Sequence, residues 1–197
     1  MEFREVVRRR RMVRSYRDRP VDRAVVERVV ALARRAPSAG FAQGQRFVVV
    51  TDRRTREAVA DLAGEDRYVA RGFDPWLSRA PVHVAVCADE RAYRARYQQA
   101  DKRDTGGPHW EVPYWLVDAG ASLMLLLLAA VDEGLAAGLL GSHRMPGLAA
   151  LLGIPPGVHP VGVVTLGHPA PDRRSGSLAR GWQDLGEAVH WERWGGG

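Results

Sequence analysis

The sequence predicts a single α+β domain that spans residues 1–197. Three apolar runs rich in valine, at residues 46–51, 82–88 and 160–167, have the length and composition of buried strands. Segments with apolar residues at helical spacing separate these runs. Apolar residues make up 46% of the chain and charged residues 26%, which is the balance of a globular domain with a sizeable core.

Two helices are expected before the first strand. Residues 2–10 form a short helix, and a basic loop that ends at Pro20 follows it. Three side chains of this helix are expected to turn inward: Phe3, Val6 and Val7. Asp22 is a suitable N-cap for a second helix over residues 23–35, because its carboxylate accepts from a free N–H of the first turn. The apolar face of the second helix consists of Val26, Val29, Val30 and Ala33.

Capping residues, glycine and proline predict where the elements in the middle of the chain begin and end. Asp52 follows the first strand and caps a helix that ends near Gly64. Residues 65–80 predict a polar loop or a short helix, and Pro81 opens the second strand. Residues 89–100 are weakly helical, whereas residues 101–113 have no periodicity and predict a surface loop near a site.

Residues 114–133 predict a long helix that is apolar nearly all round, so it lies at the centre of the domain or at a subunit interface. Its uninterrupted apolar run, residues 119–131, is too short to span a bilayer, and we expect no membrane partner. The basic N-terminus does not resemble a signal peptide, and a cytoplasmic location is expected by default.

The last third of the chain is expected to contain a short strand, a short helix, a longer strand and a tail. A strand is expected over residues 137–140, a helix over 146–152 and the third clear strand over 160–167. The tail, residues 168–197, has little core of its own but carries three tryptophans. We therefore expect it to pack on the body of the domain or on a second subunit.

The charge and the reactive side chains exclude several classes of site. The net charge of +6 raises a nucleic-acid hypothesis, but the basic residues are interspersed with acidic ones along the chain. Cys87 is alone and lies in a strand, which excludes a disulfide framework and a cysteine metal site. No pair of histidines has metal-ligand spacing with a supporting carboxylate, so no metal is expected.

Two short segments carry the strongest functional signal. The run Arg10-Arg11-Met12-Val13-Arg14 puts three guanidinium groups within five residues, and a turn there would converge them on one dianion. The alternative is a solvated helix end. The run Ala36-Pro37-Ser38-Ala39-Gly40 is either a turn that ends a helix or a place where backbone N–H groups approach a ligand closely.

Six segments in order resemble the nitroreductase family of FMN-dependent oxidoreductases. They are Arg10 to Tyr16 with Arg19-Pro20-Val21, Ala36 to Gly44, Ala129 to Gly138, Leu152-Gly153-Ile154-Pro155, Pro160 to Pro169, and Val189 to Trp194. Three positions depart from the family pattern: Met12 replaces Ser, Phe41 replaces Asn, and Gly44-Gln45 replaces Pro-Trp. These departures lie on the flavin and substrate side of the implied site.

The resemblance implies a fold and a set of cofactor contacts. The fold is a three-layer α/β/α sandwich with a central mixed, mostly antiparallel sheet, and it forms a homodimer in which the tail packs on the partner subunit. Arg10 and Arg14 hold the FMN phosphate and ribityl chain, and Arg180 is a further phosphate ligand with Arg173 and Arg174 as rivals. The other implied FMN contacts come from Arg11, Met12, Pro37, Ser38, Ala39, Gln43, Leu140 and Gly141.

The resemblance also implies an activity. NADH or NADPH reduces FMN by hydride transfer, and a nitroaromatic, a quinone or a related flat oxidant is then reduced by a ping-pong mechanism. No protein nucleophile is needed, and no side chain is expected to be catalytic. Aromatic side chains that are candidates to cover the flavin are Phe73, Trp76, Trp110, Tyr114 and Trp115. Two alternatives are the same fold with a specialised reaction (heterocycle oxidation, dehalogenation or flavin breakdown) and a basic nucleic-acid-binding protein.

Overall fold

A computed structural model describes residues 1–102, 110–173 and 175–196 of the chain. The helices are α1 (Phe3–Arg9), α2 (Arg23–Ala33), α3 (Arg53–Leu62), α4 (Glu65–Val69), α5 (Glu90–Tyr97), α6 (Tyr114–Asp132), α7 (Leu148–Leu151) and α8 (Leu185–Ala188). Short 3-10 turns are η1 (Ala39–Phe41), η2 (Ser142–Arg144) and η3 (Gly176–Arg180). The strands are β1 (Gln45–Val50), β2 (Val82–Asp89), β3 (Ala136–Gly141) and β4 (Val158–Gly167).

The four strands form one sheet in the order β1-β2-β4-β3, and every pair of neighbours is antiparallel. A bulge between Val86 and Cys87 lets β4 accommodate Pro160, which lies beyond the end of the β3 ladder. One parallel bridge, Met12 with Ala137, adds the N-terminal segment to the outer edge of β3. The four strands are thus antiparallel throughout, and among the described residues only this isolated bridge is parallel, which confirms the mostly antiparallel sheet that the resemblance implies.

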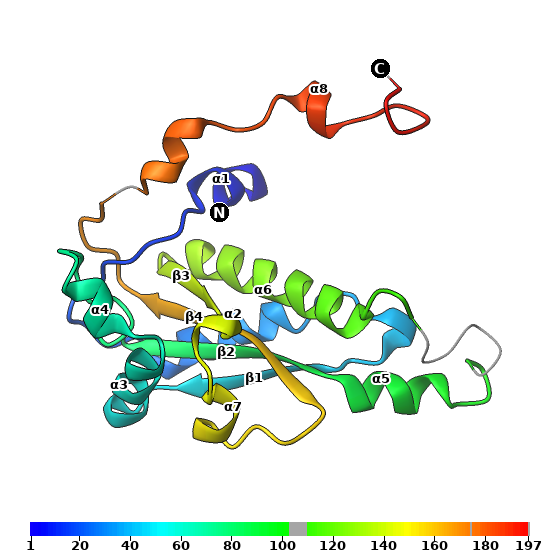
Figure 1. The fold of residues 1–197 in the computed structure, drawn as a ribbon, viewed down its shortest axis with the longest axis horizontal. Coiled ribbons are helices and arrows are strands. Elements are labelled where there is room, and N and C mark those ends of the chain that lie inside the picture. The colour runs from blue at the N-terminus through cyan, green and yellow to red at the C-terminus, as the bar shows by residue number, and fades with distance from the viewer. Residues whose placement is uncertain (103–109, 174, 197) are drawn as a thin grey trace.

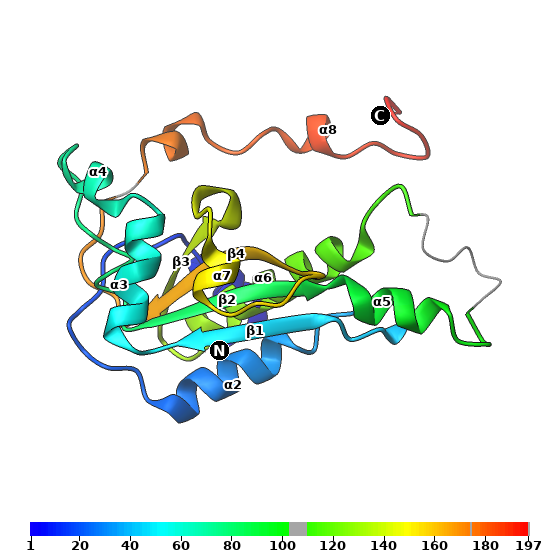
Figure 2. The same ribbon diagram turned by 60° about the horizontal axis from the view of Figure 1, so that its bottom comes forward.

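Alternation along β2 divides the interior into two layers (Figures 1 and 2). Val82, Val84 and Val86 face a core built with α2 and α6, whereas Ala85 and Cys87 face α3 and α7. Successive side chains of a strand point to opposite faces, so both faces of β2 are buried. The result is the three-layer α/β/α sandwich that the sequence predicts.

Both predicted aspartate caps are confirmed. The Asp22 carboxylate accepts from the Ala24 N–H at 2.9 Å, and the Asp52 carboxylate accepts from the Thr55 N–H at 2.8 Å. Each one satisfies a donor that the first turn of a helix leaves without a partner. This is why α2 and α3 begin where the sequence predicts.

The prediction for the first helix is partly wrong. Val6 is buried, but Phe3 is 71% exposed and Val7 is also exposed. The helix has only seven residues and lies along the C-terminal half of α6, where the N-terminal ammonium group contacts Asp132 at 2.7 Å. One face of so short a helix covers one row of side chains on α6, and its other apolar side chains remain on the surface.

The length argument against a membrane span is also wrong. Helix α6 has 19 residues, because residues 114–118 continue the helix before the apolar run, and it is long and apolar enough to cross a membrane by length and composition alone. In this structure it packs on the sheet and on α2, and it buries Asp118. Only 39% of its apolar window is buried, so part of its surface has no cover from this chain.

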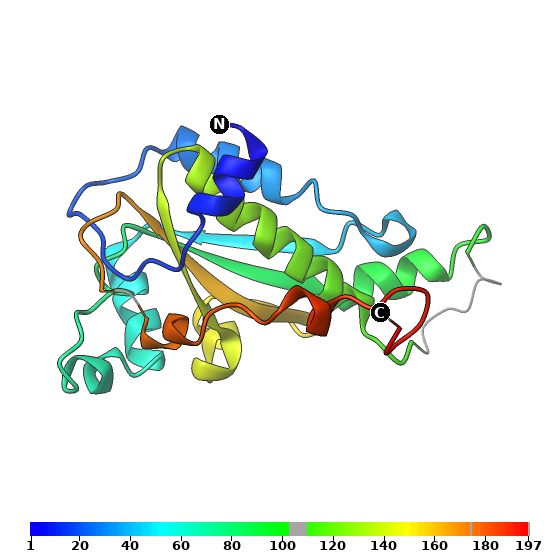
Figure 3. The same ribbon diagram turned by 90° about the horizontal axis from the view of Figure 1, so that it is seen from above.

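The tail runs along the outside of the domain, with the described side chains of residues 175–195 exposed apart from that of His190 (Figures 1 and 3). Trp182, Trp191 and Trp194 are among the most exposed side chains, and Trp194 is 90% exposed. Of the two expected locations for the tail, packing on the body of its own chain therefore does not occur. Packing on a second subunit stays a prediction.

Candidate functional site

The basic N-terminal segment lies across the outer edge of β3. The Val13 N–H donates to the Ala137 carbonyl at 2.9 Å, and Val13 is buried while its neighbours Met12 and Arg14 are not. Close approach depends on Gly138, because a Cβ there would lie 2.5 Å from the Val13 carbonyl oxygen. This strand-like segment fixes the point from which the Arg14 side chain leaves the backbone.

A cavity of about 1090 Å³ lies beside this segment, between α3, α4 and the end of β3. Arg14 lines it, with its guanidinium carbon 5.5 Å from the centre of the Trp76 ring. Trp76 is only 4% exposed and forms part of the cavity wall together with Leu140. A cation over an indole face is a favourable contact that holds the arginine in one orientation.

The wall that contains Trp76 is rigidly supported. The buried Glu65 carboxylate accepts from the Trp76, Leu77 and Ser78 N–H groups at 2.7, 2.6 and 3.1 Å. On the other side of this wall, His83 contacts the Leu77 carbonyl through Nε2 at 2.7 Å. Burial lowers the pKa of His83 to about 4, so the ring is neutral at pH 7 and donates this hydrogen bond.

The tail contributes to the cavity through Arg173. This residue lines the cavity, and its guanidinium carbon lies 5.9 Å from the centre of the Phe73 ring. Arg180, which was the preferred phosphate ligand from the sequence, lies in the exposed turn η3 and does not line the cavity. Arg174 lies outside the described residues. Of the two tail arginines that the structure describes, Arg173 therefore reaches the cavity and Arg180 does not.

The turn at residues 37–43 lies at the opposite end of the sheet. It precedes β1, whose first residue Gln45 pairs with Ala88, whereas the N-terminal segment bridges Ala137 at the far end of the ladder. The length of β1 separates the two ends by roughly 20 Å. Within one chain, the two halves of the predicted FMN site do not meet.

Three contacts hold this turn in place. The Ala39 N–H donates to the Asp118 carboxylate at 2.8 Å, and the Gln43 N–H donates to Ser38 Oγ at 3.0 Å. The Arg96 Nε donates to the Gly40 carbonyl at 2.7 Å. The Ala39 N–H is thus directed at a carboxylate of its own chain, so the flavin contact predicted for it is not available in this arrangement.

Two residues of the turn adopt left-handed backbone angles without being glycine. Phe41 has φ 57° and Gln43 has φ 51°, a region that a bulky residue rarely adopts. Asparagine is more favourable there, and it is the residue of the family pattern at position 41. Phe41 is 75% exposed, so the strained turn directs an aromatic side chain into solvent. Strain of this kind is typical of functional sites.

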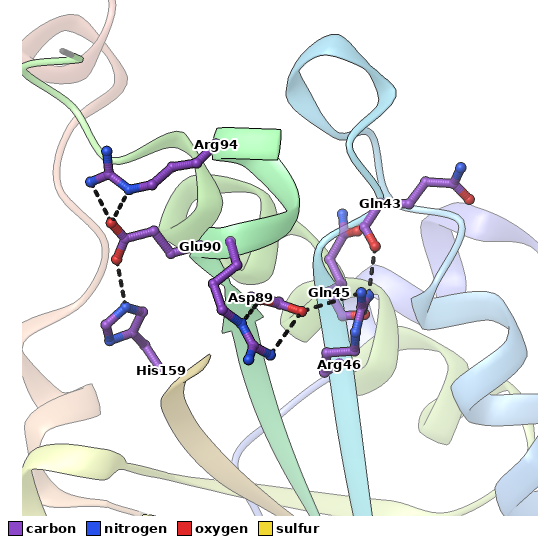
Figure 4. Close-up of polar contacts among 8 residues, drawn as sticks. Gln43, Gln45, Arg46, Asp89, Glu90, Arg94 and His159 are labelled. Carbon is purple, nitrogen blue, oxygen red and sulfur yellow. Dashed lines mark hydrogen bonds and ion pairs between the residues drawn. The ribbon is translucent and has the colours of Figure 1, made fainter. Parts of the chain in front are cut away.

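Figure 4 shows how the end of the turn is fixed to the sheet. The Gln43 carbonyl accepts from Arg46 Nη1 at 2.6 Å, and Arg46 also forms an ion pair with Asp89 at 3.4 Å. The Gln43 side chain points away from this cluster, and it is exposed. Gln43 is therefore free to contact a molecule outside its own chain.

The aromatic side chains predicted to cover a flavin divide between the two ends. Phe73 and Trp76 line the cavity. Trp110 instead lies with Tyr93, Tyr97, Tyr114 and Trp115 beside the 37–43 turn, with ring centres 4.5 to 6.3 Å from Trp110. Each end of the sheet thus carries its own aromatic surface.

Of the predicted cofactor residues, the structure brings Arg14, Leu140 and the rival Arg173 to one cavity. Arg10, Arg11, Met12 and Gly141 lie close by in sequence but do not line it, and Pro37, Ser38, Ala39 and Gln43 are at the other end. Gly141 is constrained by packing, since a Cβ there would lie 2.8 Å from the His143 ring. Residues 103–109 of the predicted surface loop 101–113 lie outside the described residues.

Sequence reasoning missed two buried carboxylates, Asp118 and Glu65. Asp118 directly precedes the apolar run 119–131 within the same predicted helix, and a charged side chain buried next to such a run needs a specific partner, which is a signal for its role. Glu65 has no comparable signal, because its partners are backbone groups 11 to 13 residues away. Within the described residues, no group of three histidine, cysteine or acidic side chains is arranged to hold a metal.

Comparison with known proteins places this geometry in a family. The sequence profile of the Nitroreductase family matches residues 7–168. The chain is 30% identical over 168 residues to an Archaeoglobus fulgidus protein with the provisional name NADH dehydrogenase/NAD(P)H nitroreductase, with 83% of each protein covered. It is 31% identical over 167 residues to the Bacillus subtilis protein named FMN reductase [NAD(P)H], covering 81% of this chain and 63% of that one.

The fold comparison agrees with the sequence comparison. The solved structure of B. megaterium NfrA2 superimposes with a TM-score of 0.78 at 23% identity, covering 98% of this chain and 75% of that one. The family profile matches well over half of the chain, from the N-terminal basic segment to the end of β4. This chain belongs to the Nitroreductase family.

Proposed function

We propose that this protein is an FMN-dependent oxidoreductase that uses NADH or NADPH. Two relatives with about 30% identity are named FMN reductase [NAD(P)H] and oxygen-insensitive NADPH nitroreductase, the second from Salmonella typhimurium. The observation that carries the proposal is the cavity in which Arg14 stacks on Trp76 and Arg173 lies over Phe73. A phosphate group and a flat ring system require this combination of guanidinium and aromatic side chains.

The residues present fit FMN. The cavity volume of about 1090 Å³ is slightly above the usual range for ligand pockets, roughly 300–1,000 Å³. Arg14 and Arg173 offer charge-assisted hydrogen bonds to a phosphate, and Leu140 and Trp76 offer an apolar wall. Arg10 and Arg11 lie within four residues of Arg14 and complete the basic end.

We infer that a second copy of the chain supplies the other half of each site. Phe41 and Gln43 point outward from a strained and well-anchored turn, which fits contact with a molecule beyond their own chain. The face formed by α1 and α6 also carries exposed apolar side chains, namely Phe3, Val7, Leu116, Val117 and Met124. An isologous dimer that covers this face and accepts the tail buries these groups.

The chain's own residues then have defined tasks. Bound FMN supplies hydride acceptance and donation. Arg14, with Arg173, anchors the phosphate, and the Glu65-supported wall keeps Trp76 fixed against the cavity. The same cavity admits NADH or NADPH and then a nitroaromatic, a quinone or a related flat oxidant, which gives ping-pong kinetics. No side chain acts as nucleophile or general base in this scheme.

The direct test is the absorption spectrum of the purified protein, followed by anaerobic addition of NADH or NADPH. We expect flavin bands that bleach on reduction and return when a quinone or nitroaromatic is added. Initial-rate plots against both substrates should give parallel lines. A colourless protein that does not bind added FMN, or one that binds DNA with a steep salt dependence, contradicts the proposal.

A further inference from the structure

Two arginines that line the cavity, Arg67 and Arg71, have no acidic partner among the described residues, and we call this part of the cavity the rim. Arg67 lies in α4, and Arg71 lies in the turn that follows the end of this helix at Val69. Both line the cavity, and both are exposed. Among the described residues, no carboxylate oxygen lies within 4.0 Å of either guanidinium group.

This lack of partners contrasts with the pairing of helical arginines elsewhere in the chain. Arg23, Arg53 and Arg94 each pair with a glutamate four residues away on their own helix. A phosphate monoester carries the opposite charge and matches the fork of a guanidinium group, so it is a suitable partner for Arg67 and Arg71.

None of the acidic side chains that line the cavity forms an ion pair with Arg67 or Arg71 in the part of the chain that the structure describes. Asp172 accepts from the Arg14 N–H at 3.1 Å, and Asp74 is 3.9 Å from Arg79. Glu65 binds three backbone N–H groups of the wall. Asp61 and Asp66 line this cavity and also a second, smaller one. Arg67 and Arg71 are therefore available to an external anion.

An aromatic stack lies beside these arginines. The Tyr68 and Phe73 rings stack with centres 4.4 Å apart and 17° between their planes, and both line the cavity. Tyr68 directly follows Arg67 in the chain. A flat ring system with a phosphate close to it, such as a 2′-phosphorylated adenosine, has its two recognition features at this rim.

The rim and the inner end of the cavity share Phe73, over which Arg173 lies, but they differ in their other arginines. At the inner end Arg14 is half-buried over the buried Trp76 ring, whereas Arg67 and Arg71 are exposed at the entrance. A cofactor that stays bound needs the enclosed inner end, and a co-substrate that enters and leaves in every turnover is met by the entrance. The two ends therefore suit two different phosphate-bearing ligands.

We propose that Arg67 and Arg71 form a binding site for the 2′-phosphate of NADPH and make the enzyme prefer NADPH to NADH. This inference rests on the proposed function, because it assigns the reductant to the same cavity. The Tyr68–Phe73 stack lies against the adenine ring, and the two arginines contact the phosphate on the adjacent ribose. NADH has a hydroxyl group at that position and gains nothing from the two charges.

The test uses direct binding of two nucleotide probes to the FMN-loaded protein by calorimetry: adenosine 2′,5′-bisphosphate and 5′-AMP. We expect the native protein to bind the bisphosphate roughly ten- to hundredfold more tightly, which is the value of charge-assisted contacts to one phosphate. Arg67→Gln and Arg71→Gln should each reduce this ratio, and the double variant should abolish it. The KM for NADPH should rise by a similar factor while the KM for NADH stays unchanged.

The matched control is Arg34→Gln with Arg54→Gln, which removes the same charge from two exposed arginines that do not line the cavity. Equal affinity of the native protein for both probes overturns the proposal, as does a ratio that survives in the double variant. A loss of FMN affinity in the rim variants also overturns it, because the arginines then serve the FMN phosphate. If the native protein binds no FMN, the proposed function itself fails, and the calorimetric ratio still reports on the rim.

Discussion

The Asp118 carboxylate on the core helix α6 accepts a hydrogen bond from the Ala39 N–H at 2.8 Å, and this bond ties the outward-facing turn to the centre of the domain. The same Oδ2 atom accepts from the Tyr93 hydroxyl at 2.7 Å. Burial, together with this carboxylate, raises the pKa of Tyr93 well above its usual range, so Tyr93 stays protonated and remains a donor. A buried charge thus sets the position of residues 37–43.

Replacement of Asp118 should weaken flavin binding as well as the fold. Asp118→Leu leaves the partly buried Ala39 N–H and the buried Tyr93 hydroxyl without this acceptor, and a buried polar group without a partner costs about 1–3 kcal/mol. We expect a lower thermal midpoint and a higher Kd for FMN in a fluorescence titration. Asp118→Asn keeps an acceptor oxygen and should retain most of the affinity. If the leucine variant loses thermal stability but binds FMN as the native protein does, the turn has no part in the site.

Arg14→Ala should reduce FMN affinity by roughly 1.5–3 kcal/mol, because it removes a charge-assisted contact to the phosphate. Its position over the Trp76 ring already orients the guanidinium, so little ordering is left to occur on binding. FMN titration of the variant measures the effect. Arg19→Ala is the matched control, since Arg19 is exposed and does not line the cavity. Equal FMN affinity of the native protein and Arg14→Ala would remove Arg14 from the site.

The two tail arginines should differ in the same titration. Arg173 lines the cavity and contacts Phe73, whereas Arg180 lies in an exposed turn. We expect Arg173→Ala to raise the Kd for FMN by about tenfold and Arg180→Ala to leave it unchanged. The reverse order would mean that the tail takes another path around the cavity when FMN is bound.

The stability of the protein should fall in mild acid because of His83. Its pKa is about 4 in the folded protein and 6.5 in a free side chain, so the unfolded chain binds the proton first as the pH falls. The contribution of neutral His83 to the free energy of unfolding is complete above pH 6.5 and is lost as the pH falls from about 6.5 to 4. The loss amounts to roughly 2 kcal/mol by pH 5. His83→Gln keeps a donor for the Leu77 carbonyl but does not titrate. Urea unfolding at pH 7 and pH 5 should show a smaller difference for the variant, and equal differences would contradict this assignment.

The exposed tryptophans of the tail should contribute to the stability of the dimer. Trp191 and Trp194 are 69% and 90% exposed on the single chain, and large aromatic side chains contribute strongly to interfaces. We expect Trp191→Ala with Trp194→Ala to shift the protein from dimer toward monomer in sedimentation at micromolar concentration. A native protein that sediments as a monomer with FMN bound would contradict the dimer itself.

The regular elements could be predicted because each has a local cause. Asp22 and Asp52 fix the starts of two helices, and the unbroken run of apolar residues around Val82, Val84 and Val86 predicts a strand buried on both faces. These signals need only neighbouring residues. The order β1-β2-β4-β3 decides which distant segments meet, and local patterns do not predict it; the resemblance to a known family implied only the layers and a mostly antiparallel sheet.

The composition of the site was harder to predict, because it depends on the path of segments with no periodicity. Arg173 and Arg180 have the same chemistry and lie seven residues apart, and only the course of the tail after β4 separates their roles. The exposure of Phe3 likewise depends on how little of α6 a seven-residue helix covers. The commitment of the Ala39 N–H to Asp118 depends on packing between residues 79 positions apart.

The central claim is that each FMN lies between two copies, with Arg14 from one chain and the 37–43 turn from the other. The most direct measurement mixes two variants with different affinity tags, Arg14→Ala and Asp118→Leu, and isolates the mixed dimer. If each site is shared between two chains, one site of the mixed dimer combines the native Arg14 of one chain with the native turn of the other. The mixed dimer should then bind one FMN with native affinity, although neither parent variant does. If the mixed dimer binds FMN as weakly as its parents, each site belongs to a single chain and the account is contradicted.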